Sequence, residues 1–306
     1  MQSYDNIIIG GGHNGLICAT YLAQKGQSVF LLEAPDALGG LASTREFYPG
    51  FRSPVAHSLS HFSETVVKEL NLLKHGYRPS ATVLDTTGLN LQGEHVVVSG
   101  EHISGVKSAD QTTYADYLAL LKRFAKMLQP FWLKTMPRIG DNSFPDLMTF
   151  GQLGLKLRLL GKKDMGEFMR VAMLPARDLM DENFDNDILK AMLSWDGLIG
   201  SKMAPRSPNA TVLNMLYRMS GQHHGAHSLP EGGIENLINA LHNAALAEGV
   251  TVQTSTLVKR IVIEGSSAGL VATGVELADG IRINGTRVIS SADPKQTFLK
   301  LVGANN

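Results

Sequence analysis

The chain has 306 residues, of which 43% are apolar, and its 28 basic and 28 acidic residues give zero formal charge at pH 7. This length is enough for one large core or two smaller ones, and the balanced charge excludes a global field that would attract nucleic acid or an anionic membrane. The only cysteine, Cys18, excludes an internal disulfide and a redox-active dithiol, and we expect it to pack inside a helix.

The first predicted element is a short β-branched strand, Asn6 to Ile9, which runs directly into Gly10. No signal-peptide pattern precedes it and no run of about 18 apolar residues follows, which predicts a cytoplasmic protein. Apolar residues at helical spacing predict a helix from Asn14 to Lys25 that stops at Gly26, and "SVFLLE" (28–33) predicts a second strand. This order of strand, glycine turn, helix and strand is typical of dinucleotide binding.

Three glycines in the predicted turn, Gly10, Gly12 and Gly15, match the pattern G-x-G-x-x-G. The first permits a tight turn, the second lets a pyrophosphate approach the backbone, and the third lets the helix pack closely on the strand. His13 and Asn14 lie at the start of the helix, where unpaired N–H groups and the helix dipole attract phosphate. We therefore expect all five residues to bind a cofactor diphosphate.

An acid, Glu33, ends the second predicted strand, and Ala34 follows it. A carboxylate at this position accepts hydrogen bonds from ribose hydroxyls and repels a 2′-phosphate, which favours an adenosine with a free 2′-OH over NADP. NAD and FAD share this half-site. The segment "EAPDALGG" resembles the E-x5-GG continuation of glutathione-reductase-like flavoproteins, and this resemblance implies that Gly39 and Gly40 lie close to the pyrophosphate of FAD.

The segments "IIGGGHNGL" (8–16), "LLEAPDALGG" (31–40) and "REFYPGF" (45–51) resemble the phytoene-desaturase-like FAD-dependent oxidoreductases. The branch that they resemble is the one named pyridine nucleotide-disulfide oxidoreductase domain-containing protein 2, although the cysteines for disulfide chemistry are absent. The resemblance extends to residues 178–211, 229–241 and 288–298, and so covers nearly the whole chain.

The resemblance implies an α/β fold with a glutathione-reductase-like FAD/NAD(P)-binding Rossmann-type domain and an inserted, largely helical substrate domain. We expect residues 1–75 and 223–292 to form the FAD-binding domain and residues 76–222 to form the substrate or cap domain. Residues 293–306 are expected to begin a truncated second substrate segment.

Short β-prone pieces after about residue 73 precede long helical stretches in the expected cap. Apolar side chains at i, i+3, i+4 and i+7 spacing predict an amphipathic helix, whose apolar face forms the core or the wall of a substrate pocket. These side chains are Tyr114, Tyr117, Leu118, Leu121, Phe124, Leu128 and Phe131.

The segment "GQLGLKLRLLGKK" (151–163) mixes leucines with Lys156, Arg158, Lys162 and Lys163. Its leucines do not gather on one face when projected at about 100° per residue, which favours a solvated, partly buried helix. Weak contact with a membrane surface is the alternative.

Three histidines, His223, His224 and His227, lie in a glycine-bounded loop and raise the question of a metal. No acid or cysteine accompanies them at matching spacing, so we expect no metal site. Their position before "LPEGG" suggests, by analogy, a place near the flavin or the substrate.

Pro230, Gly232 and Gly233 precede a predicted helix that ends near Gly249, and strand-like segments with glycine turns follow. This order resembles the return of the family's chain to its cofactor domain. The resemblance implies that the backbone of Val258 contacts the adenine ring.

The resemblance implies an FAD-dependent oxidoreductase of the dehydrogenase or desaturase type, which transfers hydride from an apolar, for example isoprenoid-like, substrate to the flavin. Oxygen or a quinone would reoxidise the flavin, which performs the chemistry itself. We identify no catalytic residue, because His57 and His61 fit a structural role as well as a place beside the substrate. A noncatalytic nucleotide-fold scaffold and a flavin amine oxidase are the alternatives.

Chains of the family continue to a further glycine-rich FAD segment beside the flavin, and the sequence up to Asn306 contains no such segment. We therefore expect a fragment, half of a split enzyme or a reduced protein. The expected partners are a small apolar substrate and, for a split enzyme, a complementing chain that carries the C-terminal FAD segment. Nucleic acid is not expected.

Overall fold

The computed structural model describes residues 3–56, 58–138, 140, 143–208, 211–266 and 269–303. The chain divides into two compact units. Unit 1 contains residues 1–59, 63–81 and 229–306, and unit 2 contains residues 60–62 and 82–228. The sequence-based division changed domains after residues 75 and 222, whereas the compact units change after residues 81 and 228.

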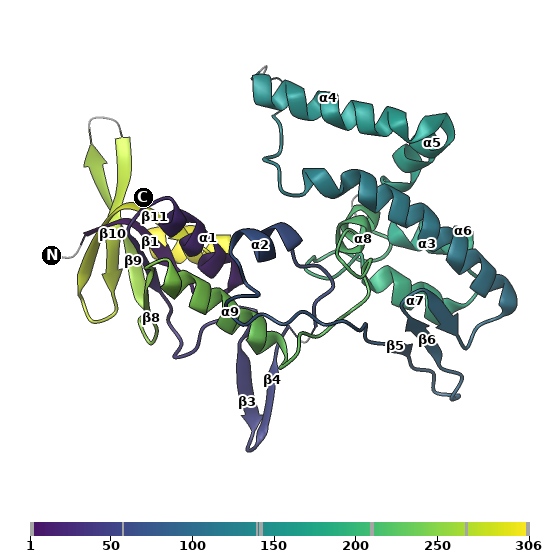
Figure 1. Cartoon of the computed structure of the whole chain (residues 1–306), viewed down its shortest axis with the longest axis horizontal. Helices are drawn as coiled ribbons and strands as arrows, with labels where there is room; N and C mark the ends of the chain where they lie inside the picture. Colours follow the sequence, from purple (N-terminus) through teal and green to yellow (C-terminus); the bar gives the residue numbers. More distant parts are fainter. Residues whose placement is uncertain are drawn as a thin grey trace. The chain divides into compact units, whose positions relative to one another are not determined.

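Unit 1 is built on a six-stranded sheet (Figure 1). Its strands, in spatial order, are β8 (Thr251–Gln253), β2 (Val29–Leu32), β1 (Ser3–Ile9), β11 (Arg282–Ser290), β10 (Gly269–Leu277) and β9 (Val258–Ser266). The first four are parallel to their neighbours, whereas β10 runs antiparallel to both β11 and β9. The carboxyl ends of β8, β2, β1 and β11 therefore meet at one edge of the sheet. The expected α/β fold is confirmed.

The central strands are apolar because both faces of the sheet are covered. All four residues of β2 are buried, as are the last four of β1. Ile7 and Phe30 contribute to the core on one face together with Leu301 of η3 (Gln296–Gly303), and this segment packs against β9. Residues 296–303, assigned from the sequence to the start of a substrate segment, thus lie in unit 1.

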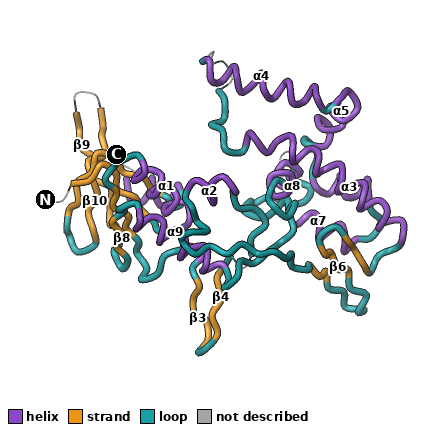
Figure 2. Tube along the Cα trace, in the orientation of Figure 1, coloured by secondary structure: helices purple, strands orange, loops and turns teal. Residues whose placement is uncertain are grey.

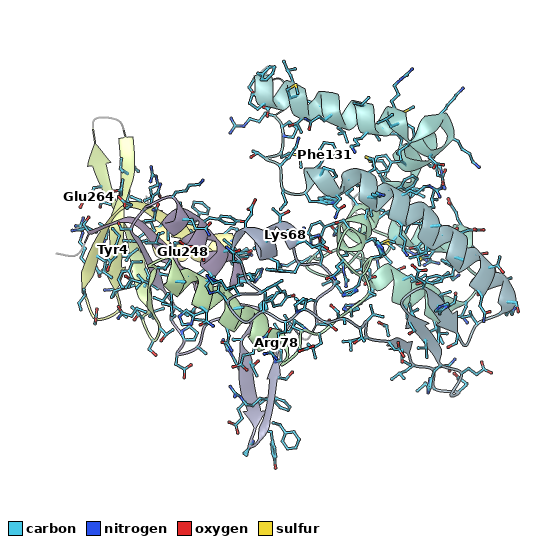
Figure 3. The ribbon with its side chains drawn as sticks, in the orientation of Figure 1. Tyr4, Lys68, Arg78, Phe131, Glu248 and Glu264 are labelled. Carbon is cyan, nitrogen blue, oxygen red and sulfur yellow. The ribbon has the colours of Figure 1, made fainter. Side chains whose placement is uncertain are left out.

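Two long helices of unit 1, α1 (His13–Gln24) and α9 (Ile234–Ala247), pack against each other. Both agree with the predicted helices, and the expected apolar stripe of α9 is buried. Two residues labelled in Figure 3 tie loops to these helices. The backbone N–H of Arg78 donates to Asn236 Oδ1 at 2.8 Å, and Gln24 Nε2 donates to Glu248 Oε1 at 3.3 Å.

Smaller elements complete unit 1. The helix α2 (Glu64–Glu69) has Ser63 as its N-cap, whose hydroxyl accepts from the Val66 N–H. The 3-10 turn η1 (Gly40–Ala42) leads into an antiparallel ribbon of β3 (Thr44–Tyr48) and β4 (Phe51–Pro54).

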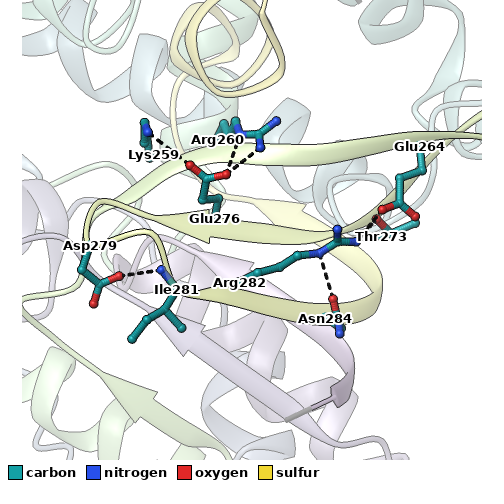
Figure 4. Close-up of polar contacts among 9 residues, drawn as sticks. All are labelled: Lys259, Arg260, Glu264, Thr273, Glu276, Asp279, Ile281, Arg282 and Asn284. Carbon is teal, nitrogen blue, oxygen red and sulfur yellow. Dashed lines mark hydrogen bonds and ion pairs between the residues drawn. The ribbon is translucent and has the colours of Figure 1, made fainter. Parts of the chain in front are cut away.

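Ion pairs cross the antiparallel part of the sheet on its exposed side (Figure 4). Glu276 of β10 accepts hydrogen bonds from Arg260 at 2.6 Å and Lys259 at 3.2 Å, both on β9, and these bonds lower the pKa of Glu276. Arg282 of β11 pairs with Glu264 of β9 at 2.6 Å. Opposite charges on neighbouring strands favour this register over a slipped one.

Unit 2 is mainly helical (Figure 2). It contains one small antiparallel sheet, in which β6 (Val96–Ser99) pairs with β5 (Thr86–Gly88) and β7 (His102–Ser104). Its helical segments are α3 (Ser108–Leu128), η2 (Gln129–Phe131), α4 (Phe144–Leu159), α5 (Gly161–Val171), α6 (Ala176–Asn183), α7 (Asp187–Trp195) and α8 (Thr211–Met219). The predicted amphipathic helix is confirmed, because Tyr114, Tyr117, Leu121, Phe124 and Leu128 of α3 are all buried.

The helix α4 has two apolar faces, which explains why its leucines do not form a single stripe. Projected at about 100° per residue, Leu153 and Leu157 fall on one face and pack against the core of unit 2. Phe144, Leu155 and Leu159 fall on the opposite face and remain 76%, 58% and 73% exposed. Within the described residues, no helix has the length and hydropathy needed to cross a bilayer.

Candidate functional site

The predicted glycine turn lies between β1 and α1, at the carboxyl end of β1. Gly10 adopts a φ of 102°, which side chains rarely tolerate. A Cβ on Gly15 would overlap the carbonyl oxygen of Gly10, whereas a Cβ on Gly12 would meet no atom nearer than 4.0 Å. Gly15 is thus required for packing, and Gly12 borders open space that a ligand can enter.

The beginning of α1 is a favourable place for an anion. Gly12 is its N-cap, and the first turn contains no acidic side chain, so the unpaired N–H groups and the positive end of the dipole are not neutralised from within the helix. His13 and Asn14 are exposed in this turn. Although His13 is exposed, desolvation by its surroundings lowers its pKa, which favours a neutral imidazole at pH 7.

Glu33 follows β2 and is 9% exposed. Its Oε2 accepts a hydrogen bond from the backbone N–H of Gly11, which ties the acid to the glycine turn. Among the described residues, Oε1 has no hydrogen-bond or ion-pair partner, so it remains able to accept from a ligand hydroxyl. The acid therefore supports the turn with one oxygen and offers the other.

The second glycine pair lies against the first turn. The N–H of Gly39 donates to the carbonyl of Gly11 at 2.9 Å, and Gly39 forms a parallel bridge with Gly12. Gly39 and Gly40 have φ angles of 115° and 58°, and a Cβ on Gly40 would lie 3.5 Å from the Cα of Gly12. The structure thus brings together the two glycine motifs predicted from the sequence.

Ser291 is a neighbour of the turn that sequence reasoning missed. It follows β11, and its hydroxyl lies 3.1 Å from the carbonyl oxygen of Ile9 and 3.0 Å from that of Gly10, able to donate to either. A Cβ on Gly10 would fall 2.5 Å from this hydroxyl. Parallel pairing of β11 with β1 creates this contact, and only the "VISSADP" segment (288–294) signalled it in the sequence.

Val258, the expected adenine contact, begins β9 at the edge of the sheet, and its side chain is buried. The chain just before it is tied to the acid, because the N–H of Thr256 donates to the carbonyl oxygen of Glu33 at 2.8 Å. Ala34 lies exposed beside Glu33. The sequence-predicted residues from Gly10 to Val258 therefore gather at the carboxyl edge of the sheet.

Other residues singled out in the sequence lie elsewhere. His57 falls outside the described residues. His61 belongs to unit 2 and packs on Tyr217 with ring centroids 4.6 Å apart, and burial lowers its pKa. Cys18 is half-buried in α1, and desolvation raises its pKa, which keeps it a thiol.

Unit 2 contains a cavity of about 290 Å³. Tyr114, Leu118 and Met192 belong to its apolar wall, and Asp196 belongs to its polar wall. The histidines at 223, 224 and 227 also line it. No three metal-binding side chains converge anywhere in the part of the chain that the structure describes.

The parallel sheet, the glycine turn at its carboxyl edge and the acid after the next strand define a dinucleotide-binding protein of the Rossmann type. A profile of the family described as "Flavin containing amine oxidoreductase" matches residues 15–297, and the chain belongs to this family. The family's cofactor is a flavin. The resemblance predicted from the sequence is thereby confirmed at the level of the superfamily.

The chain is 28% identical over 324 residues to pyridine nucleotide-disulfide oxidoreductase domain-containing protein 2 of Mus musculus, covering 97% of this chain and 55% of the relative. It is 27% identical over 313 residues to a limonene dehydrogenase polypeptide of Castellaniella defragrans, covering 97% and 53%. The chain thus spans about half the length of these curated relatives. A putrescine oxidase variant with redesigned cofactor binding has a similar fold, with a TM-score of 0.60, 16% identity and coverage of 96% and 59%.

Proposed function

We propose that this chain supplies the adenosine diphosphate half of an FAD site in an oxidoreductase of the dehydrogenase or desaturase type. The observation that carries the proposal is the open space at Gly12, bordered by Gly39 and Gly40 and by the start of α1. Bound flavin would supply the acceptor of hydride. The chain's own residues bind and orient the nucleotide.

Each part of the site has a distinct role in this proposal. The N–H groups at the start of α1 hold the diphosphate, and the Oε1 atom of Glu33 accepts a hydrogen bond from a ribose hydroxyl. The edge of β9 at Val258 offers backbone groups to adenine. Ser291 holds the carbonyl groups before the turn, so that Gly10 keeps its left-handed conformation.

An apolar substrate is favoured by the chemistry of unit 2, because aromatic, leucine and methionine side chains form much of its cavity. The name of one relative, a limonene dehydrogenase polypeptide, points to oxidation of an apolar compound. The family description and the putrescine oxidase fold support amine oxidation as the second candidate. Amine-dependent release of hydrogen peroxide would identify that reaction.

The experiment that tests the proposed cofactor measures ADP and FAD binding to the full chain by calorimetry, together with the visible flavin spectrum of the purified protein. Binding of both nucleotides, with FAD tighter, supports a complete flavin site. Equal affinities for ADP and FAD indicate the adenosine half alone, as expected for a chain that works with a complementing polypeptide. A protein that binds neither is a scaffold, and that outcome contradicts the proposal.

We further propose that the outer face of α4 contacts anionic lipid. Phe144, Leu155 and Leu159 give it an exposed apolar surface, and α4 lies at the outer side of unit 2 (Figure 1). Every charged residue from 147 to 163 is basic. Exposed apolar side chains bordered by cations are typical of helices that bind membrane surfaces.

A further inference from the structure

The cavity of unit 2 has a buried ion pair at its polar end. Asp196 follows α7 and keeps 29% of its side chain exposed, whereas Arg218 of α8 is 6% exposed. Arg218 Nη1 lies 2.7 Å from Asp196 Oδ1, and Arg218 Nε donates to the Ser60 hydroxyl at 3.0 Å. The guanidinium therefore lies behind the carboxylate and holds it at the cavity wall.

His227 completes this cluster as a neutral side chain. Its Nε2 lies 3.2 Å from Arg218 Nη2 and 3.9 Å from Asp196 Oδ1. A guanidinium has donors only, so His227 Nε2 must accept. A proton on that nitrogen would be directed at the arginine, and the cluster thus contains one negative and one positive charge.

The remaining charges of the cavity also compensate each other. Lys122 and Glu101, which line it, form an ion pair with each other. The cavity as a whole attracts neither a cation nor an anion by net charge. Oδ2 of Asp196 has no hydrogen-bond or ion-pair partner within the described part of the chain, which leaves one strong acceptor for a ligand donor.

The apolar walls fix the rest of the ligand's chemistry. Tyr117, Leu118 and Met215 line the cavity from α3 and α8. The volume of about 290 Å³ is at the lower end of the range for small-molecule sites, about 300–1,000 Å³. A compact hydrocarbon skeleton with one polar end matches this combination.

We propose that this cavity binds an uncharged, largely apolar molecule with a hydroxyl group, which donates a hydrogen bond to Asp196. An amine would place a second cation beside Arg218, and a carboxylate would place a second anion beside Asp196. The proposal deepens the proposed function, since it names the class of ligand on the substrate side, and it rests on that function only for the subsequent oxidation. Binding itself requires no flavin.

The experiment compares three probes with one skeleton, 1-octanol, octylamine and octanoate, by calorimetry with the full chain at pH 7.5. We expect 1-octanol to bind at least about tenfold more tightly than the two charged probes, a difference of about 1.4 kcal/mol. Octylamine or octanoate binding as tightly as 1-octanol would overturn the proposal. Failure of FAD binding would not affect this result, so the two proposals fail separately.

Two variants locate the site. Asp196→Asn leaves Arg218 without its counter-charge, so octanoate should bind at least about tenfold more tightly than to the wild type while 1-octanol binding weakens. Asp187→Asn is the matched control, because that side chain lies on α7 and is 93% exposed, and its binding should equal that of the wild type. Unchanged probe preference in Asp196→Asn would contradict the proposal.

Leu118→Trp provides a test that leaves the ion pair intact. The larger side chain fills the cavity from α3, and 1-octanol binding should be lost. Thermal melting and circular dichroism establish that each variant is folded, and Leu118→Trp serves if Asp196→Asn does not fold. Wild-type affinity for 1-octanol in folded Leu118→Trp would show that the alcohol binds elsewhere.

Discussion

Gly15 lies so close to Gly10 that a Cβ on Gly15 would overlap the carbonyl oxygen of Gly10. The Gly15→Ala variant must therefore move α1 away from β1. We expect a loss of about 1–3 kcal/mol in the free energy of unfolding, as for other overpacked sites, and a loss of nucleotide binding. Urea unfolding and ADP calorimetry measure the two effects, and wild-type stability would show that the turn relaxes without cost.

Gly12→Ala separates binding from folding at the same turn. Its Cβ would meet no protein atom nearer than 4.0 Å, and the residue has an ordinary φ of −69°. The expected stability change is at most about 1 kcal/mol, the cost of a poorer N-cap. ADP affinity should fall at least about tenfold, because the methyl group occupies the space next to the helix N-terminus. An unchanged ADP affinity would place the diphosphate elsewhere.

Glu33 supports the turn and is proposed to bind ribose, and two variants separate these roles. Glu33→Ala leaves the Gly11 N–H without its acceptor, so we expect a loss of about 1–3 kcal/mol in unfolding free energy. Glu33→Gln retains an acceptor and should be more stable than the alanine variant, while ADP binding is weakened in both. Equal stability of the two variants would show that the hydrogen bond to Gly11 contributes little.

Local patterns in the sequence were sufficient to predict β1, α1 and β2 and the close approach of Gly12 and Gly39. The reason is that the glycine spacing and the acid after β2 lie within one strand-turn-helix-strand unit, where neighbours in sequence are neighbours in space. Ser291 could not be placed in this way. Its contact with Gly10 joins residues 281 positions apart and depends on the parallel pairing of β11 with β1.

The cluster in unit 2 also escaped sequence reasoning. Asp196 has no motif around it, and it meets Arg218 only because both lie at one end of a cavity formed between packed helices. For α4 the pattern was visible but was compared with a single apolar stripe. Two opposite stripes, one at Leu153 and Leu157 and one at Leu155 and Leu159, account for the same leucines.

Asp196 should make the stability of unit 2 depend on pH. Burial raises its pKa from 3.8 to about 6, although Arg218 opposes this shift. The folded state therefore holds the proton more tightly than the unfolded state. The contribution to stability is fully present below about pH 4 and is lost as the pH rises through about 6, by up to about 3 kcal/mol.

The measurement is urea unfolding of wild type and Asp196→Asn between pH 4 and 7. Arg218, His227 and Tyr114 also face this region, so the wild-type curve alone would not isolate Asp196. The difference between the two proteins should change with pH in the stated direction. A difference that is independent of pH would show that Asp196 keeps an ordinary pKa.

The two faces of α4 give opposite predictions for leucine substitutions. Leu155→Ser with Leu159→Ser alters only exposed side chains, so stability should change by less than about 0.5 kcal/mol per substitution. Sedimentation with phosphatidylserine vesicles should be reduced, and binding of the wild type should weaken with added salt because Lys156 and Arg158 contribute attraction. Leu157→Ser removes a contact with the core and should lower stability instead. If the wild type does not sediment with these vesicles, or if the double variant binds them equally well, the outer face of α4 is not a lipid-binding surface.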